Sequence, residues 1–492
     1  MQLIKIHPSD NVAVALEDIP AGTEVTVDGK KVIVTELIKR GHKLALAPIA
    51  CGSFVTKYGN TIAEATADIA EGAWVHTHNV KTTLKEGGEY VYDHKLYDLP
   101  STKERSFMGY RRKDGRAAIR NEIWIIPIVG CVNGIAKQIV EETQDLVKGS
   151  IEGIYTFPHP FGCSQLGGDL EQTKRLLAAL VRHPNAGGVL CLELGCENLT
   201  HDLFLSELGE YDPERVKFLK CQDVSDDVGE GVKIVKELAS YVAGFVREEI
   251  PASELVVGMK CGGSDGLSGI TANPAVGRFS DRLISLGGST VLTEVPEMFG
   301  AENILFSRCE NDDVFRKAVG MVNDFKDYFV SHGQVVYENP SPGNKDGGIT
   351  TLEDKSCGCV QKGGSAQIVD VLKYAEPVTK KGLNVLSGPG NDLVSATDLT
   401  AAGAHLILFT TGRGTPFGAP APTVKISTNT ALYEKKSAWI DFNAGSVAEG
   451  EDLDDAGERL LDFVIEIASG KQTKTEERGI REISIFKDGV VL

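Results

Sequence analysis

The fold is decided by EIWIIPIVG, residues 122–130, and by NGIAKQIVEETQDLV, residues 133–147, which follows it. The first segment is an unbroken apolar run of the length of one strand, and the second has the apolar spacing of an amphipathic helix. A strand with only apolar side chains is buried on both faces, which is typical of a parallel sheet covered by helices. The stretch therefore predicts one strand–helix unit of an α/β domain.

The same alternation of apolar strand and helix-like segment recurs along the rest of the chain. It predicts two α/β domains, residues 106–250 and 251–492, each with a parallel sheet covered on both faces. The further strand candidates are GIYTFPH (153–159), GGVLCLELG (187–195), RVKFLKCQ (215–222), ELVVGMK (254–260), STVLTEV (289–295), GLNVLSG (382–388) and HLILFTTG (405–412).

The first eighty residues contain a weak repeat instead. DIPAGTEV (18–25), PIACGSFV (48–55) and DIAEGAWV (68–75) each place a glycine three residues after isoleucine and a valine three residues later. This spacing is typical of a tight turn that leads into a short strand. It predicts a small all-β module over residues 1–82. The polar segment 83–105 is then expected to be a linker.

Composition excludes several classes of partner. The 51 Lys and Arg against 69 Asp and Glu give a formal charge of −18, so nucleic acid is not expected as the main partner. No run approaches the roughly 18 apolar residues of a membrane helix. The N-terminus lacks the layout of a signal peptide, so we expect a cytoplasmic protein with no membrane partner. No dinucleotide or P-loop fingerprint is present.

Three cysteines lie in glycine-flanked loops just after predicted strands: Cys163, Cys196 and Cys261. Ligand sites of parallel sheets lie at the carboxyl ends of the strands. Three converging thiolates could hold iron, as a single ion or as an iron–sulfur cluster. The alternative is that they are inert core cysteines, which are common. Cys357 and Cys359 form only a C-x-C pair.

Histidines supply candidate proton-transfer groups. His76 and His78, in WVHTHN, are expected at the end of a strand, where residues two apart share one face. They could bind a metal or move protons, or they could simply be polar residues at a strand end. His159 lies between two prolines that hold its backbone, which favours a positioned role.

The chain resembles the altronate/galactarate dehydratase family over essentially its whole length. The motifs that carry the resemblance are IKIHPSDNVAVAL (4–16), WVHTHN (74–79), FGCSQ (161–165), LGCEN (194–198), KCGGSDGLSGITANPAVG (260–277), TEVPEMFGAE (293–302), NPSPGNKDGGITTLEDKS (339–356), GPGND (388–392) and FTTGRGTPFG (409–418).

This resemblance implies a fold and a reaction. The N-terminal module is expected to be SAF-like and the later domains to be α/β with Rossmann-like sheets. The expected reaction removes water from a sugar acid, D-altronate, to give 2-dehydro-3-deoxy-D-gluconate in hexuronate catabolism, with a requirement for Fe2+, mononuclear or in a cluster.

Such a reaction needs a base at the carbon next to the carboxylate and an acid for the leaving hydroxyl, for which His76, His78 and His159 are candidates. Arg413 could bind the carboxylate in bidentate fashion. The remaining candidates for contacts to the substrate are Ser264, Asp265, Asn273, Lys345, Asn391 and Asp392.

Two other functions fit the same sequence. A sister lyase on this scaffold would act on galactarate, or on a sulfonate with loss of sulfite. A non-catalytic sensor would bind a sugar acid without turnover and would not need iron. In each case the partner is a small organic acid, with a sugar acid as the main expectation, and assembly into a homo-oligomer stays open.

Overall fold

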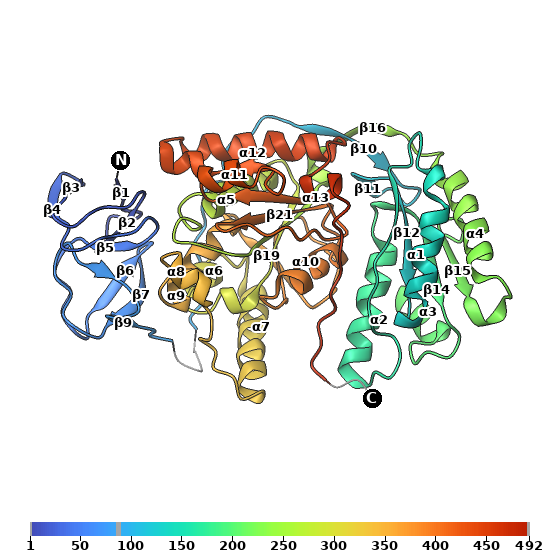
Figure 1. Ribbon diagram of the computed structural model, residues 1–492, viewed down its shortest axis with the longest axis horizontal. Coiled ribbons are helices and arrows are strands. Elements are labelled where there is room, and N and C mark those ends of the chain that lie inside the picture. Colours follow the sequence, from blue (N-terminus) through green and yellow to red (C-terminus); the bar gives the residue numbers. More distant parts are fainter. Residues whose placement is uncertain (1, 85–89, 490–492) are drawn as a thin grey trace.

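Short strands build an all-β module at one end of the molecule (Figure 1). The computed structural model describes residues 2–84 and 90–489. The predicted repeat is confirmed, because its glycines, Gly22, Gly52 and Gly72, all turn the chain with φ of 81–83°. The strands form sheets β1-β2-β5-β8, β3-β4 and β6-β7-β9. They are β1 (Leu3–Ile4), β2 (Val12–Ala15), β3 (Glu24–Val27), β4 (Lys30–Ile33), β5 (Lys43–Ala45), β6 (Phe54–Lys57), β7 (Asn60–Ala65), β8 (Trp74–Val75) and β9 (Val80–Lys81).

Residues 90–105 have no helix or strand, and their first part is docked on the third domain. The Tyr90 hydroxyl donates to Glu302, and the Tyr92 hydroxyl donates to the Cys309 carbonyl at 2.6 Å. A small antiparallel sheet, β11-β10-β16, then joins the second and third domains. Its strands are β10 (Ser106–Arg111), β11 (Ala117–Ala118) and β16 (Arg247–Pro251).

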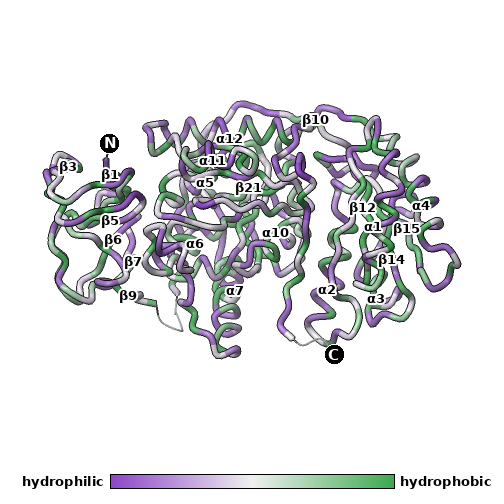
Figure 2. Tube along the Cα trace, viewed as in Figure 1, coloured by the Kyte–Doolittle hydropathy of each residue, from purple (hydrophilic) through white to green (hydrophobic). Residues whose placement is uncertain are grey.

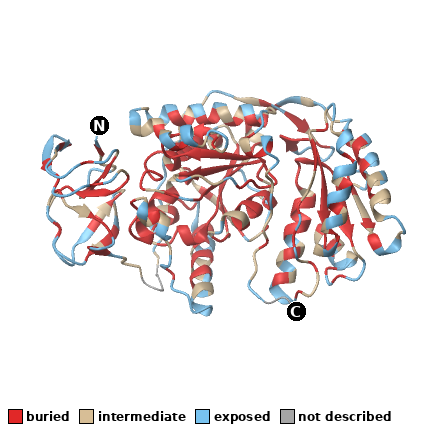
Figure 3. Ribbon diagram, in the orientation of Figure 1, coloured by how far each residue is buried: buried red, intermediate tan, exposed pale blue. Residues whose placement is uncertain are grey.

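The second domain is a parallel sheet covered on both faces, as the apolar strands predict. Along its strand β12, Ile123 and Ile125 pack on the side of α1 and α4, while Trp124 and Ile126 pack on the side of α2 and α3. Both faces of this strand are therefore core (Figure 3). The sheet order is β13-β12-β14-β15. The elements are β12 (Glu122–Pro127), α1 (Asn133–Glu142), β13 (Gly153–Thr156), α2 (Gly167–Arg182), β14 (Ala186–Glu193), α3 (His201–Leu208), β15 (Val216–Lys220) and α4 (Asp227–Val242).

The third domain is built on a seven-stranded, all-parallel sheet of order β19-β20-β18-β17-β21-β22-β23. Helices α5 and α12 cover one face and α10 covers the other. Hydrophobic residues concentrate on its inner strands (Figure 2). The strands are β17 (Val256–Cys261), β18 (Ser289–Leu292), β19 (Ile368–Leu372), β20 (Gly382–Leu386), β21 (Leu406–Thr411), β22 (Thr423–Ser427) and β23 (Phe442–Asn443). The helices are α5 (Ala272–Ser285), α6 (Glu302–Phe306), α7 (Asp312–Ser331), α8 (Pro342–Asp346), α9 (Leu352–Cys359), α10 (Asp392–Ala401), α11 (Thr430–Lys435), α12 (Leu453–Ala468) and α13 (Lys474–Glu477).

The segment after α13 returns to the second domain without forming a helix or strand (Figure 1). Arg481 makes two hydrogen bonds to Glu122 of β12, at 2.8 and 2.9 Å. Ile485 is buried in the core that surrounds Trp124. The end of the chain therefore fastens the second and third domains together. Among the described residues, no helix is both long and apolar enough to cross a bilayer.

Candidate active site

The candidate site lies at the carboxyl edge of the seven-stranded sheet, at its central strand β17. The chain first adds strands on the β18 side of β17 and then crosses over to place β21 on the other side. The loops after β17 and β21 meet there, because the N–H groups of Gly412 and Arg413 both donate to the Gly263 carbonyl at 3.1 Å. Open α/β sheets bind their ligands at such a crossing.

Three buried side chains converge at this edge with the spacing of metal ligands. Cys261 ends β17, Glu297 ends the short 3₁₀ turn Val295–Glu297 after β18, and Cys359 ends α9. The two sulfur atoms lie 3.5 Å apart, and Oε2 of Glu297 lies 2.9 and 3.0 Å from them. All three ligand atoms lie within 4.8 Å of one another, the only such group within residues 2–84 and 90–489. Two sulfurs and a carboxylate suit a transition metal such as iron.

Buried lysines set the charge of this Cys–Glu–Cys group. Nζ of Lys355 lies 2.7 Å from Oε1 of Glu297. Burial alone would raise the pKa of Glu297, but Lys355 and Lys362 lower it to about 2. Hydrogen bonding to Cys261, together with burial, raises the pKa of the Cys359 thiol well above its usual value. Glu297 is therefore a carboxylate that accepts a hydrogen bond from a neutral Cys359 thiol.

Glu294 borders the group on the side of β17. Its backbone lies in the left-handed region, with φ 73°, although it is not glycine. Its Oε2 accepts from the Cys261 N–H at 2.8 Å, and its Oε1 lies 3.1 Å from Nζ of Lys260, which also bonds Asp392. Burial and the charge of Glu297 raise the pKa of Glu294. Strained, buried and charged residues of this kind cluster at functional sites.

A small cavity adjoins Cys359 where the β-module meets the third domain. Its volume is about 10 Å³, the space of about one water molecule. Its wall combines residues of the hairpin β6–β7, of the loop and helix after β17, and of α9. The polar and ionisable lining residues are Lys57, Tyr58, Ser264, Asp265, Ser268, Asn273, Asp354, Lys355 and Cys359.

The β-module is held over this cavity by a buried ion cluster. Asp354 of α9 accepts from Lys43 at 2.7 Å and from Lys57 at 3.0 Å. All three side chains are at most 3% exposed. Burial would raise the pKa of Asp354, but the two lysines hold it well below its usual range. The module is thus attached through charges that have no access to water.

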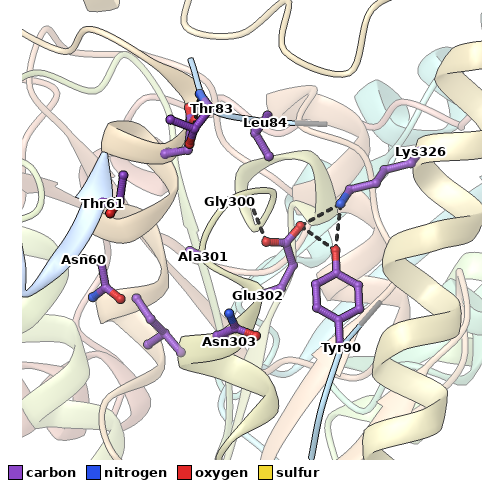
Figure 4. Close-up of a pocket in the computed structure, with 12 residues that line it drawn as sticks. Asn60, Thr61, Thr83, Leu84, Tyr90, Gly300, Ala301, Glu302, Asn303 and Lys326 are labelled. Atoms are coloured by element: carbon purple, nitrogen blue, oxygen red, sulfur yellow. Dashed lines mark hydrogen bonds and ion pairs between the residues drawn. The ribbon is translucent and has the colours of Figure 1, made fainter. Parts of the chain in front are cut away.

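A wider hollow of about 390 Å³ lies beside β7 and α6 (Figure 4). Its charged groups are already paired: Oε1 of Glu302 accepts from Lys326 at 2.8 Å and from the Tyr90 hydroxyl at 3.0 Å. Glu353 accepts hydrogen bonds from Thr82 and Thr83. The potential metal ligands of the Cys–Glu–Cys group are absent from its described lining, so the chemistry is concentrated at Cys359 instead.

The structure brings only one of the three predicted thiolates to the candidate site. Cys261 belongs to the Cys–Glu–Cys group. Cys163 and Cys196 follow β13 and β14, strands of the other parallel sheet, and Cys196 is exposed with its sulfur 3.5 Å from Gln222. The predicted trio is therefore not formed, because the two sheets have separate carboxyl edges.

The predicted strand at WVHTHN ends earlier than expected, at Val75. His76 and His78 lie in a turn, in which the Asn79 side chain bonds the His76 N–H and the Trp74 carbonyl. Both rings pack on Trp74, but His76 is buried and His78 is exposed. His76 does cross the domain boundary, with Nε2 3.0 Å from the Lys345 carbonyl, but it is not among the residues lining the cavity.

His159 lies in the second domain, where both ring nitrogens are occupied by the backbone. Nε2 donates to the Pro127 carbonyl at 2.7 Å, and Nδ1 accepts from the Phe161 N–H at 3.2 Å. These bonds fix one neutral tautomer, and burial lowers the pKa of His159 to about 4. The geometry supports a role in holding the turn rather than in proton transfer.

We expect His159 to make stability depend on pH between 6.5 and 4. Its pKa falls from an ordinary 6.5 to about 4 on folding, so the unfolded chain binds more protons in this window. The contribution of the buried neutral His159 to the free energy of unfolding is complete above pH 6.5 and is lost as pH falls through 4. Thermal midpoints of His159→Gln should therefore show a shallower pH slope than the wild type, whereas the exposed His78→Gln should keep the full slope. An unchanged slope in His159→Gln would contradict this assignment.

The predicted substrate-binding residues divide into two sets. Ser264, Asp265 and Asn273 line the cavity, and the other four predicted substrate-binding residues do not. The others lie around its rim or are engaged elsewhere. Lys345 gives its carbonyl to His76, Arg413 is exposed and donates to the Gly343 carbonyl, Asn391 caps α10, and Asp392 pairs with Lys260.

Several site residues escaped prediction from sequence: Glu297, Cys359, Lys355, Asp354, Lys57 and Tyr58. Glu297 lies in a loop that follows an apolar strand, and this position alone could have marked it as a candidate site residue. Cys359 had only the C-x-C pattern, and Lys57 and Tyr58 lie in an ordinary hairpin. Only the docking of the β-module reveals the position of Lys57 and Tyr58.

Fold and site together define a multidomain α/β enzyme with a buried sulfur–carboxylate centre beneath a β-module. The chain belongs to the altronate/galactarate dehydratase family. Residues 1–83 match the Altronate/galactarate dehydratase SAF domain. Residues 109–243 match the D-galactarate dehydratase/Altronate hydrolase second domain, and residues 252–491 match the D-galactarate/Altronate dehydratase C-terminal domain. The expected family and fold are thereby confirmed.

Characterised relatives cover the whole chain. It is 52% identical to an altronate dehydratase of Escherichia coli (strain K12), over 100% of both chains. It is also 52% identical to an altronate dehydratase of Bacillus subtilis (strain 168), over 99% of both chains. Identity to a galactarate dehydratase (L-threo-forming) of Escherichia coli (strain K12) is 32%, over 99% of this chain and 97% of the other.

Proposed function

We propose that the protein is a cytoplasmic hydro-lyase that converts D-altronate to 2-dehydro-3-deoxy-D-gluconate and water. The observation that carries the proposal is the 52% identity to two altronate dehydratases along the entire chain, against 32% to a galactarate dehydratase. A reducing cytoplasm suits the chain, since all ten of its cysteines are free.

The Cys–Glu–Cys group fits Fe2+. Soft sulfur ligands and one ionised carboxylate match the donor preferences of this ion, and the nearby lysines Lys355 and Lys362 favour the thiolate forms that a metal requires. We propose that Cys261, Glu297 and Cys359 hold iron. When bound, the iron supplies a Lewis acid for the charge that develops during loss of the hydroxyl.

The residues of the chain around the cavity would bind and orient the acid. Lys57 and Lys355 lie on the wall together with the carboxylates of Asp265 and Asp354, so the wall offers both donors and acceptors to a polyhydroxy acid. Ser264 offers a hydroxyl to the polyol. The Asn273 amide is held in one orientation, because it donates to the Gly358 carbonyl at 3.0 Å and accepts from Thr410 at 2.7 Å. The tight packing of the β-module would keep bulk water away from the reacting carbons.

Incubation of the full-length protein with D-altronate, Fe2+ and reductant tests this proposal. We expect a keto acid, measured as its semicarbazone, with turnover that is lost on metal chelation and restored by Fe2+. Product from galactarate but not altronate would transfer the assignment to the sister lyase, and release of sulfite from sulfolactate would do the same. Saturable binding of altronate without product, and independent of iron, would indicate a sensor.

A further inference from the structure

A groove of about 410 Å³ lies on the outer side of the small cavity and shares two lining residues with it, Tyr58 and Gly269. The cavity holds about one water, whereas the groove has the size of an ordinary small-molecule pocket. A sugar acid therefore fits the groove but not the cavity in this conformation. The two shared residues, Tyr58 and Gly269, mark the boundary between groove and cavity.

Tyr58 forms that boundary. It is the first residue of the two-residue turn between β6 and β7 and has φ 61°, in the left-handed region. The carboxylate of Asp10 holds the turn by accepting from the N–H groups of Tyr58 and Gly59, at 3.1 and 2.8 Å. The backbone of this residue is therefore fixed, so any opening at this boundary has to come from rotation of its side chain.

Two glycines make room for the tip of the Tyr58 ring. A Cβ on Gly269 would lie 2.2 Å from the Tyr58 hydroxyl, and one on Gly358 would lie 3.1 Å from it. The hydroxyl thus sits between two bare backbones, directly before Cys359. Burial raises the pKa of this hydroxyl above its usual value, although the residue as a whole remains partly exposed. The ring therefore has an inner end at the cavity and an outer side at the groove.

The groove is positively charged in an otherwise acidic protein. Its described lining includes Lys5, His7 and Arg278 and contains no Asp or Glu. Lys5 and Arg278 each pair with one aspartate outside the lining, Asp28 and Asp454, both at 3.2 Å. Those aspartates are more than 60% exposed, so water screens their charge, and each pair offsets only part of the attraction of Lys5 and Arg278 for an anion. Two cations in a lining without carboxylates attract a carboxylate ligand to this groove, although the chain as a whole has a formal charge of −18.

We propose that this groove is the entry site for the carboxylate substrate and that the Tyr58 ring is the gate between it and the Cys–Glu–Cys group. Lys5 and Arg278 bind the carboxylate of an incoming polyhydroxy acid. The ring then leaves the gap between Gly269 and Gly358, which joins groove and cavity. The choice of ligand rests on the proposed function, whereas the path itself does not.

Alkylation of the buried cysteines tests the path without any turnover. The metal-free full-length chain is treated with iodoacetate or with neutral iodoacetamide, and peptides with Cys261 and Cys359 are quantified by mass spectrometry. We expect Tyr58→Ala to speed labelling of Cys359 about tenfold or more with both reagents, because the barrier is removed. Tyr58→Phe keeps the ring and should label like the wild type. Tyr433→Ala, a change of an exposed tyrosine elsewhere, is the matched control.

The charge of the groove is tested by the ratio of the two reagents. Arg278→Ala and Lys5→Ala should lower the rate with iodoacetate about two- to threefold and leave the rate with iodoacetamide unchanged. The exposed Cys196 serves as an internal reference. With iron and substrate, the same variants should raise KM at unchanged kcat. Equal effects on both reagents would overturn the anion site.

Unchanged labelling of Cys359 in folded Tyr58→Ala would overturn the gate. Should that variant fail to fold, Tyr58→Leu serves in its place, since leucine leaves most of the gap open. If the cysteines are labelled as expected but the protein does not dehydrate altronate, the proposed entry path stands and only the proposed substrate is wrong. The two ideas can therefore fail separately.

Discussion

Cys359→Ser is expected to lose its bound iron and to lower kcat by about a thousandfold or more, because a serine hydroxyl stays protonated where a thiolate would bind the metal. The change removes no packing of consequence, since one sulfur becomes one oxygen. Iron per chain, kcat and the thermal midpoint are measured together. In a cobalt-substituted protein, the thiolate-to-metal absorption should also weaken.

Cys357→Ser is the matched control for this prediction. Cys357 lies two residues earlier on α9 and is also buried, but it is not a member of the Cys–Glu–Cys group. Serine at this position should keep the iron and most of the rate. Full iron content and normal turnover in Cys359→Ser would show that the sulfur pair is structural.

Asp354→Asn is expected to detach the β-module and abolish activity at neutral pH. The amide cannot neutralise Lys43 and Lys57, which are then left charged in a buried site. Breaking one side of a buried ion cluster costs about 3–5 kcal/mol. The loss should appear as a separate, earlier thermal transition of residues 1–84 and as faster hydrogen exchange in α9 and β7.

The exposed pair Lys31–Glu24 provides the comparison. Both of its side chains are more than half exposed, so Glu24→Gln should leave the thermal transitions and the rate unchanged. A wild-type melting profile in Asp354→Asn would show that apolar packing alone holds the module. The acid stability of the intact cluster has a defined sign: the pKa of Asp354 is lowered on folding, so its contribution is present at neutral pH and is lost only in strong acid.

Most of the fold could be predicted because parallel strands buried on both faces read as apolar runs. Strands β19 and β22 are not among the predicted strands, and in β22 the sequence TVKIS alternates polar and apolar residues. Its Lys425 is nevertheless buried, with Nζ 3.3 Å from the centre of the Phe409 ring, and burial lowers the pKa of this lysine well below its usual value. A lysine buried against an aromatic face is a core residue that no hydropathy pattern reveals.

The candidate site was predictable only in part, and the reason is distance along the chain. Cys261 followed an apolar strand in a glycine-rich loop and was found from that position. Its partners Glu297 and Cys359 lie 36 and 98 positions further on, with no local motif that ties the three together. Cys163 and Cys196 also follow apolar strands, but these strands belong to another sheet with its own carboxyl edge, which the local sequence does not reveal.

The returning C-terminal segment sets an order for biosynthesis. Strand β12 leaves the ribosome early, but its Glu122 has no ion-pair partner in Arg481 until that residue is made, 359 positions later. Until then the core around Trp124 lacks Ile485. The nascent second domain can form its secondary structure during translation, but it reaches its final packing only after Arg481 and Ile485 have been made. The second domain is therefore fully packed only after the third domain has been synthesised.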